Sequence, residues 1–330
     1  MIASEYSLAG KRVWVAGHRG MVGSALVRRL ARENCEIITV GRDALDLTRQ
    51  AAVERWMAEA RPQAIFLPAA RVGGILANAA QPVDFLLDNI QIATNVIASA
   101  ASVDVEKLVF LGSSCIYPKF APQPIEESAL LTGLLEPTNE AYAIAKIAGL
   151  KLCSAYRVQH GRDFVSAMPT NLYGPGDNFD LQGSHVLPAL IRKAHEAKQT
   201  GAKSLVVLGT GSPLREFMHV DDCADALITV MRRYSDVEPI NVGTGEEISI
   251  GDLGRLVAKV VGLEGRLEFD TSKPDGTPRK LMSDRKLRAL GWSPSIRLED
   301  GIREAYAWFL AQAEVRGLAP RAMVNAPQSV

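Results

Sequence analysis

A short apolar strand that runs into a glycine-rich turn and a helical pattern is the feature that most constrains this fold. Residues 11–16 read Lys-Arg-Val-Trp-Val-Ala, and Gly17-His-Arg-Gly-Met-Val-Gly follows before the helical Ser-Ala-Leu-Val-Arg-Arg-Leu. Glycines at such a turn let backbone N–H groups and the positive end of a helix approach a pyrophosphate. The spacing is G-x-x-G-x-x-G rather than G-x-G-x-x-G, so a plain glycine turn is the alternative. The order of strand, turn and helix nevertheless favours a dinucleotide site.

The residues after the second strand indicate which dinucleotide would bind. Residues 36–40, Glu-Ile-Ile-Thr-Val, form this strand and lead into Gly41 and Arg42. An acidic side chain about twenty residues past the glycines would hold the ribose 2′-hydroxyl of NAD, whereas arginine accommodates the 2′-phosphate of NADP. Arg42, together with Arg19 in the glycine turn, therefore favours NADP. The alternative is a pair of solvated arginines, and Asp43 lies next to one of them.

Strands and helices alternate along the first half of the chain, which predicts an α/β fold with a Rossmann-type, doubly wound parallel sheet. The expected helices cover residues 50–60, 84–101 and 142–159, and further strands cover 64–70, 107–111 and 164–168. From Gly174 the pattern changes to a polar loop and then a helix, which predicts a smaller, discontinuous substrate domain. We expect an NADP-binding domain over 1–174, rejoined by segments near 215–245, a mainly substrate-binding domain over 175–315, and a mobile tail over 316–330.

The residues after the central strand carry the groups best suited to catalysis. The strand ends at Leu111 and Gly112, and in an extended chain Ser113 and Cys115 would face one side and Ser114 the other. Tyr142 and Lys146 are four residues apart in a helical pattern and project from one helix face. A nearby ammonium favours the phenolate, and a serine hydroxyl could donate to a developing alkoxide. The alternative for the tyrosine is an ordinary surface position.

Further polar residues follow the next strand. Pro169, Thr170, Asn171 and Leu172 leave the same edge of the sheet, where amide groups could hold a nicotinamide. His185 precedes a helix with Pro188 in its first turn, and the positive helix end disfavours imidazolium. A plain loop donor is the alternative for this histidine.

Basic residues occur in predicted loops of the second half of the chain. Such loops are suited to phosphate recognition, and the residues concerned are Arg215, Arg279 and Lys280. The alternative is that these three side chains are solvated surface charges.

Composition excludes several classes of function. The net charge is zero with 37 basic and 37 acidic residues, so neither a nucleic acid nor a membrane surface is the expected partner. The 4 cysteines are widely spaced without a C-x-x-C pair, which argues against a metal site and a disulfide framework. With no apolar leader and no apolar run of about 18 residues, we expect a reduced, cytoplasmic protein.

Taken together, these segments resemble the extended short-chain dehydrogenase/reductase superfamily, and within it the enzymes that act on GDP-linked 4-keto sugars. The resemblance covers residues 11–309 and is most specific in Gly17-His-Arg-Gly-Met-Val-Gly-Ser-Ala, Leu111-Gly-Ser-Ser-Cys-Ile-Tyr-Pro-Lys, Glu136-Pro-Thr-Asn-Glu-Ala-Tyr-Ala-Ile-Ala-Lys, Pro169-Thr-Asn-Leu-Tyr-Gly-Pro and Lys273-Pro-Asp-Gly-Thr-Pro-Arg-Lys. It implies NADPH-dependent conversion of GDP-4-keto-6-deoxy-D-mannose to GDP-L-fucose, by epimerisation at carbons 3 and 5 and then reduction at carbon 4. Rival functions are another nucleotide-sugar epimerase or 4,6-dehydratase of this superfamily, and a non-catalytic NADP-binding scaffold.

The resemblance also implies roles for individual residues. Ser113, Tyr142 and Lys146 would form the reductase triad, and Cys115 and His185 the acid/base pair of the epimerisation. NADP(H) would contact Gly17, His18, Arg19, Gly20, Met21, Val22, Gly23, Arg42, Asp46, Leu47, Leu111, Gly112, Ser113, Ser114, Lys146, Pro169, Thr170, Asn171, Leu172 and His185. The GDP-sugar would contact Lys193, Leu208, Arg215, Asp275 and Lys280.

The same resemblance shows one substitution in the substrate site and implies an oligomeric state. Leu208 stands where related enzymes commonly carry tryptophan, which removes a flat contact to the substrate. A homodimer through the helices at 84–101 and 142–159 is expected.

Overall fold

The computed structural model describes residues 5–181, 183–273 and 275–312. Its centre is a six-stranded sheet with the order β10-β5-β4-β3-β1-β2, in which every neighbouring pair is parallel. Every residue of β3 and β4 is buried, as expected of a parallel sheet that is covered on both faces. The strands are β1 (Arg12–Val15), β2 (Glu36–Ile38), β3 (Ala64–Leu67), β4 (Lys107–Leu111), β5 (Asp163–Pro169) and β10 (Ile240–Val242).

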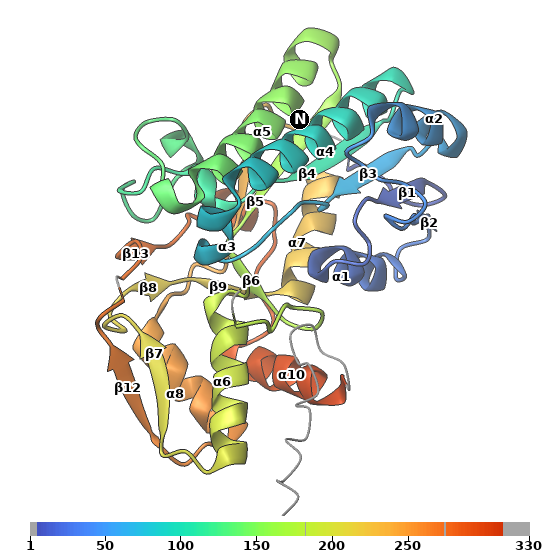
Figure 1. Ribbon diagram of the computed structural model, residues 1–330. Helices are drawn as coiled ribbons and strands as arrows, with labels where there is room; N and C mark the ends of the chain where they lie inside the picture. Colours follow the sequence, from blue (N-terminus) through green and yellow to red (C-terminus); the bar gives the residue numbers. More distant parts are fainter. Residues whose placement is uncertain (1–4, 182, 274, 313–330) are drawn as a thin grey trace, which may run out of the picture.

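Helices cover both faces of this sheet (Figure 1). One face packs against α1 (Met21–Leu30) and α7 (Val220–Arg233), through a core that includes Leu26 and Leu227. The opposite face packs against α2 (Gln50–Ala60), α4 (Pro82–Ser102) and α5 (Glu140–His160), through a core that includes Trp14 and Ile97. The α/β fold with a doubly wound sheet, which the sequence predicts, is therefore confirmed.

A smaller lobe packs below the sheet in Figure 1 around its own hydrophobic core, which includes Phe179, Leu190, Leu253 and Phe309. Its helices are α6 (Val186–Thr200), α8 (Ile250–Val261) and α10 (Leu298–Ala311). Its strands are β7 (Ser204–Leu208) paired with β12 (Arg266–Asp270), and β8 (Leu214–Arg215) lying between β11 (Ile248–Ser249) and β13 (Arg279–Lys280).

Short segments join the two lobes. β6 (Asn171–Tyr173) pairs with β9 (Phe217–His219), so the exit from β5 lies beside the entry to α7. The remaining elements are α3 (Ile75–Ala80), α9 (Arg285–Ala289) and the 3₁₀ turns η1 (Ser114–Ile116), η2 (Glu127–Ala129) and η3 (Pro137–Asn139). We propose that the two lobes are the two domains that the sequence predicts, with residues 220–242 belonging to the domain of the large sheet. The predicted tail, 316–330, lies outside the described residues.

The structure corrects two local predictions and adds one helix. Arg215, Arg279 and Lys280 are on short paired strands rather than in loops, because β13 and β8 pair side by side. The chain after Gly112 is not extended throughout, since residues 114–116 form a 3₁₀ turn that Ser113 caps. The segment after β13 ends in the long helix α10, which is not among the helices predicted above. In the described part of the chain, no helix combines the length and the apolar character that crossing a bilayer requires.

Candidate active site

The glycine turn between β1 and α1 has the shape of a pyrophosphate cradle. Gly17 has a φ of +97°, and a Cβ there would lie 2.9 Å from the Cα of Ala69. A Cβ on Gly23 would collide with the Gly17 carbonyl oxygen, so only glycine allows the helix to approach the turn this closely. Gly20 occupies the N-cap position of α1, where no side chain caps the helix. The N–H groups of the first helical turn are therefore available to an anion, as a dinucleotide requires.

Two arginines lie at the rim of this cradle. The Arg19 guanidinium pairs with Asp43 at 2.9 Å and lies against Gly41, and both partners of the pair are largely exposed. Arg42 follows Gly41 directly and is exposed as well. The exposed pair is worth little in free energy, and a phosphate can compete for Arg19.

Farther along the rim, other predicted cofactor residues stabilise their own loop. The Asp46 carboxylate accepts from the Thr48 N–H and hydroxyl at 3.0 and 2.8 Å, and this lowers its pKa. The Leu47 carbonyl accepts from Asn95 at 2.9 Å. The His18 Nδ1 is buried without a partner among the described residues, so a ligand in the cradle can satisfy it. These features fit a dinucleotide.

Lys146 is buried where β4 ends. Its ammonium donates to the Leu111 carbonyl at 2.7 Å and lies 4.9 Å from the Phe110 ring centroid and 5.8 Å from that of Tyr142. Burial lowers the pKa of Lys146 to about 7. Gly112, the residue after Leu111, packs against Met168, and a Cβ there would collide with the Met168 side chain.

Contrary to the expectation from the sequence, Lys146 does not make the phenolate the resting form of Tyr142. Burial raises the pKa of Tyr142, the nearby Cys115 raises it further, and a hydrogen bond with Ser113 only partly opposes them. Desolvation is the largest cause. Burial also lowers the pKa of Lys146 to about 7, so only part of the Lys146 population is charged near neutral pH. The site holds Tyr142 as a protonated phenol, the form that donates a proton.

Cys115 lies among groups from three parts of the chain. Its backbone N–H donates to the Ser113 hydroxyl at 3.2 Å. Its Sγ accepts from the Asn139 amide at 3.3 Å and from the Lys280 ammonium at 3.8 Å. The structure thus brings Ser113, Cys115, Tyr142 and Lys280 into one place; Ser114, between the first two, is buried in η1.

His185 stands at the N-cap position of α6 and opens to solvent. The protein packed around the ring and the positive charge of Lys280 both lower its pKa, which favours the neutral imidazole. Lys280 therefore lies near both His185 and Cys115 and connects the two groups that the sequence predicts as an acid/base pair.

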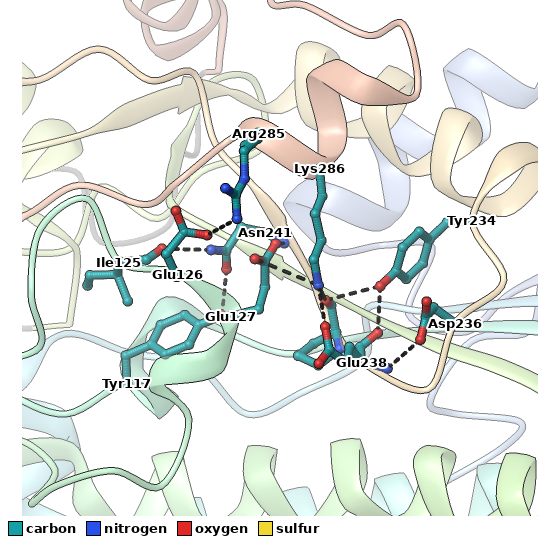
Figure 2. Close-up of polar contacts among 11 residues, drawn as sticks. Tyr117, Ile125, Glu126, Glu127, Tyr234, Asp236, Glu238, Asn241, Arg285 and Lys286 are labelled. Carbon is teal, nitrogen blue, oxygen red and sulfur yellow. Dashed lines mark hydrogen bonds and ion pairs between the residues drawn. The ribbon is translucent and has the colours of Figure 1, made fainter.

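A buried polar network, shown in Figure 2, holds the chain that follows Cys115 against β10. Asn241 in β10 accepts from the Tyr117 hydroxyl at 2.6 Å and donates to the Ile125 carbonyl at 2.9 Å. Its backbone N–H donates to Glu127 at 3.0 Å, and Lys286 lies between Glu127 and Glu238.

The same network fixes the strand that carries Lys280. Ile125 accepts from the Ser283 N–H and donates to the Leu281 carbonyl, at 2.9 and 2.8 Å. Tyr117 is two residues from Cys115, and Leu281 is next to Lys280, so this network anchors the two chain segments that carry the sulfur and the ammonium. Sequence reasoning missed it, although an asparagine within the apolar strand Ile240–Val242 was a usable signal.

The predicted nicotinamide residues lie at the seam between the lobes. Pro169 ends β5, and the buried Thr170 donates to the Glu216 carbonyl at 3.3 Å, as Asn171 does at 2.8 Å. Leu172 is partly buried in β6. These residues border the sheet edge that also carries Gly112.

The predicted substrate residues line the smaller lobe. Lys193 borders a cavity of about 370 Å³ between α6 and β7, and burial lowers its pKa. Leu208, at the end of β7, is 51% exposed. Burial also lowers the pKa of Arg215, against the attraction of Asp275. The Asp275 carboxylate accepts from the Thr210 N–H and hydroxyl at 2.9 and 2.7 Å and so anchors its own loop.

Comparison with known proteins places this arrangement in a family. Residues 13–243 match the model of the NAD dependent epimerase/dehydratase family. The chain is 58% identical to the GDP-L-fucose synthase of Sinorhizobium fredii, over 93% of this chain and 98% of that one. It is 58% identical to GDP-L-fucose synthase 1 of Arabidopsis thaliana, over 93% and 95% of the two chains. The solved GDP-L-fucose synthetase of Naegleria fowleri bound to NADP is 33% identical, with a TM-score of 0.86 over 93% of this chain and 95% of that chain. On this evidence the chain belongs to the NAD dependent epimerase/dehydratase family.

Proposed function

We propose that this protein is an NADPH-dependent GDP-L-fucose synthase, which converts GDP-4-keto-6-deoxy-D-mannose to GDP-L-fucose. The observation that carries the proposal is the thiol of Cys115 beside the Ser113 and Tyr142 hydroxyls. Lys280 lies 3.8 Å from the thiol and close enough to His185 to lower its pKa. A reductase alone has no need of a thiol and an imidazole around its ketone. Relatives at 58% identity that carry this enzyme's name add support.

The first stage is epimerisation. The 4-keto group acidifies the protons on carbons 3 and 5, and a base removes one of them to leave an enolate. The Ser113 and Tyr142 hydroxyls donate to the enolate oxygen. Cys115 and His185 work on opposite faces of the sugar, so that one removes the proton and the other returns one from the far side. The neutral His185 is able to accept a proton.

The second stage is reduction at carbon 4. The glycine turn, Arg19 and Arg42 would bind the dinucleotide, and NADPH supplies the hydride when bound. Tyr142, held as a phenol, gives its proton to the oxygen at carbon 4 as the ketone becomes an alcohol. Lys146 stabilises the phenolate that remains, because its ammonium lies close to the Tyr142 ring.

The GDP portion belongs, in this proposal, to the smaller lobe. Lys193 and Arg215 supply positive charge for the diphosphate, and their partial burial strengthens that attraction. Leu208 offers an apolar contact in place of an aromatic one. The role of Asp275 in this proposal is to hold its loop beside Arg215, because its carboxylate accepts hydrogen bonds from Thr210.

We also propose a homodimer through α4 and α5. These helices pack side by side on one face of the sheet, and both expose apolar side chains, including Leu87 and Val158 at 50% and 77%. Light scattering in solution would measure the mass of the assembly. All 4 cysteines, being free thiols, fit a reducing compartment such as the cytoplasm.

Substitution of the thiol tests the proposed epimerisation. Cys115→Ser should suppress exchange of solvent deuterium into carbons 3 and 5 of the ketosugar, while reduction of an already epimerised ketosugar continues. Mass spectrometry of the sugar measures the exchange, and NADPH absorbance measures the reduction. Cys35→Ser, at a site remote from the turn after β4, is the matched control. Unchanged exchange in Cys115→Ser would exclude the base role, and a wild-type protein that forms no GDP-L-fucose would exclude the function.

A further inference from the structure

Asn139 stands at the N-cap position of α5, yet its side chain does not cap the helix. Asparagine is among the residues most favoured at this position, because its Oδ1 can accept from the N–H groups of the first turn. Here the amide turns away instead, and its Nδ2 donates to the Cys115 sulfur at 3.3 Å. The local preference is overridden in favour of one contact with the proposed base.

The groups around Cys115 leave its sulfur in the role of acceptor. An amide Nδ2 can only donate, and so can the Lys280 ammonium, which approaches the sulfur at 3.8 Å. The Cys115 backbone is fixed separately, through its N–H and the Ser113 hydroxyl. A sulfur that faces two donors is matched to the thiolate, the form that removes a proton.

We propose that Asn139 is a positioning residue, which holds the Cys115 sulfur as a hydrogen-bond acceptor and directs it at the sugar carbon. The inference rests on the proposed function. In the step, the sulfur forms a new S–H bond, the C–H bond breaks, and its electron pair passes into the enolate. The thiolate accepts the Asn139 hydrogen bond more strongly than the thiol that forms from it. The amide contact therefore stabilises Cys115 in the form present before it removes the proton.

A second observation ties Asn139 to the substrate side. Its Oδ1 is buried and has no hydrogen-bond partner among the described residues. A buried acceptor of this kind requires a donor in the working complex, and a hydroxyl of the sugar is the donor that the site would receive. The amide would then hold the sulfur with one atom and a sugar hydroxyl with the other, which fixes the distance between base and substrate.

Two variants test the proposal through thiol reactivity. Asn139→Asp keeps the shape, removes the donor and adds a negative charge, while Asn139→Ala removes the donor without adding charge. Alkylation by iodoacetamide is followed across pH by peptide mass spectrometry, with Cys35 of the same molecule as the internal reference. We expect the Cys115 profile to move to higher pH, by about one pH unit for Asn139→Asp, a tenfold loss at low pH. The shift for Asn139→Ala should be smaller and in the same direction, and the Cys35 profile should not move.

A second readout links the contact to the reaction. Deuterium exchange into the ketosugar should fall ~10-fold or more in both variants, while reduction of an already epimerised ketosugar stays within about twofold, which a general loss of structure would not allow. Glu140→Gln, at the exposed neighbouring residue, should alter neither. Unshifted alkylation profiles in both variants would overturn the role of Asn139. Absence of exchange in the wild-type protein would instead overturn the proposed function, and the alkylation profiles would still decide the contact.

Discussion

The Tyr117–Asn241 hydrogen bond offers a quantitative test of how the site is held. Both side chains are buried, at 3% and 0% exposure, and the hydroxyl donates to the Asn241 Oδ1 at 2.6 Å. Tyr117→Phe leaves that oxygen buried without its partner, which costs ~1–3 kcal/mol of unfolding free energy. Asn241→Leu leaves the Tyr117 hydroxyl unpaired and removes the bond to Ile125, so we expect a loss of about 2–4 kcal/mol. The Ile125 carbonyl is not left bare, because it still accepts from the Ser283 N–H.

The double variant separates the pair from its surroundings. Because it replaces both polar partners with apolar groups, it leaves neither of them unsatisfied. We therefore expect the double variant to be about 1–2 kcal/mol more stable than the sum of the two single losses predicts. Urea unfolding at constant protein concentration measures each value, with the midpoint and the slope reported separately.

A matched control distinguishes burial from the loss of a hydroxyl as such. Tyr6→Phe makes the same change where the hydroxyl bonds to Glu106 at an exposed position, and it should cost within about 0.5 kcal/mol. Losses that simply add in the double variant would refute the reasoning, since they would mean that the two side chains act independently. A change in slope without a change in midpoint would point to the unfolded state instead.

Two further predictions concern single groups. Tyr142→Phe should lower the rate of hydride transfer by ~10²-fold or more, because the phenol is the proposed proton donor. Stopped-flow NADPH absorbance at saturating ketosugar measures this rate, and a rate close to wild type would exclude the role. Burial lowers the pKa of His219, whose Nδ1 accepts from the Asp221 N–H at the start of α7. The unfolded chain therefore binds a proton at this histidine more readily than the folded chain does. The free energy of unfolding keeps its full His219 contribution above about pH 6.5 and loses it progressively as the pH falls further. The urea midpoint should therefore drop more between about pH 7.5 and 5.5 in the wild type than in His219→Asn, and equal drops would contradict this.

Much of the larger lobe could be predicted because its signals are local. The turn from β1 into α1 needs glycine where a Cβ would collide with the backbone, and such a requirement is visible in the sequence. Helix α2 runs over 50–60, the range that the sequence predicts. The four-residue spacing of Tyr142 and Lys146 in α5 likewise survives, because a helix fixes which side chains share a face.

The parts that could not be predicted depend on contacts between distant segments. Lys280 lies on a strand only because β8 is present beside it, and two-residue strands carry no periodic signal. The direction of the Tyr142 pKa depends on how completely neighbouring elements exclude water, which helix spacing does not report. The sequence shows Asn139 only as part of the motif at the start of α5, and nothing in it indicates that the amide turns toward a sulfur 24 residues away.

The two proposed stages of the reaction draw on the lobes unequally, and this has a physical consequence. Ser113, Tyr142 and Lys146 come from the end of β4 and from α5, so reduction depends on the larger lobe and its cofactor cradle. The proposed epimerisation also uses His185, the N-cap residue of α6, and a Cys115 thiol beside Lys280 of β13, so it draws on the smaller lobe as well. Asn241→Leu removes a hydrogen bond to the Ile125 carbonyl, which also binds the segment after Lys280. We therefore expect this substitution to impair proton exchange before it impairs hydride transfer. The order of the two losses would show that the seam, rather than the sheet alone, assembles the epimerising site.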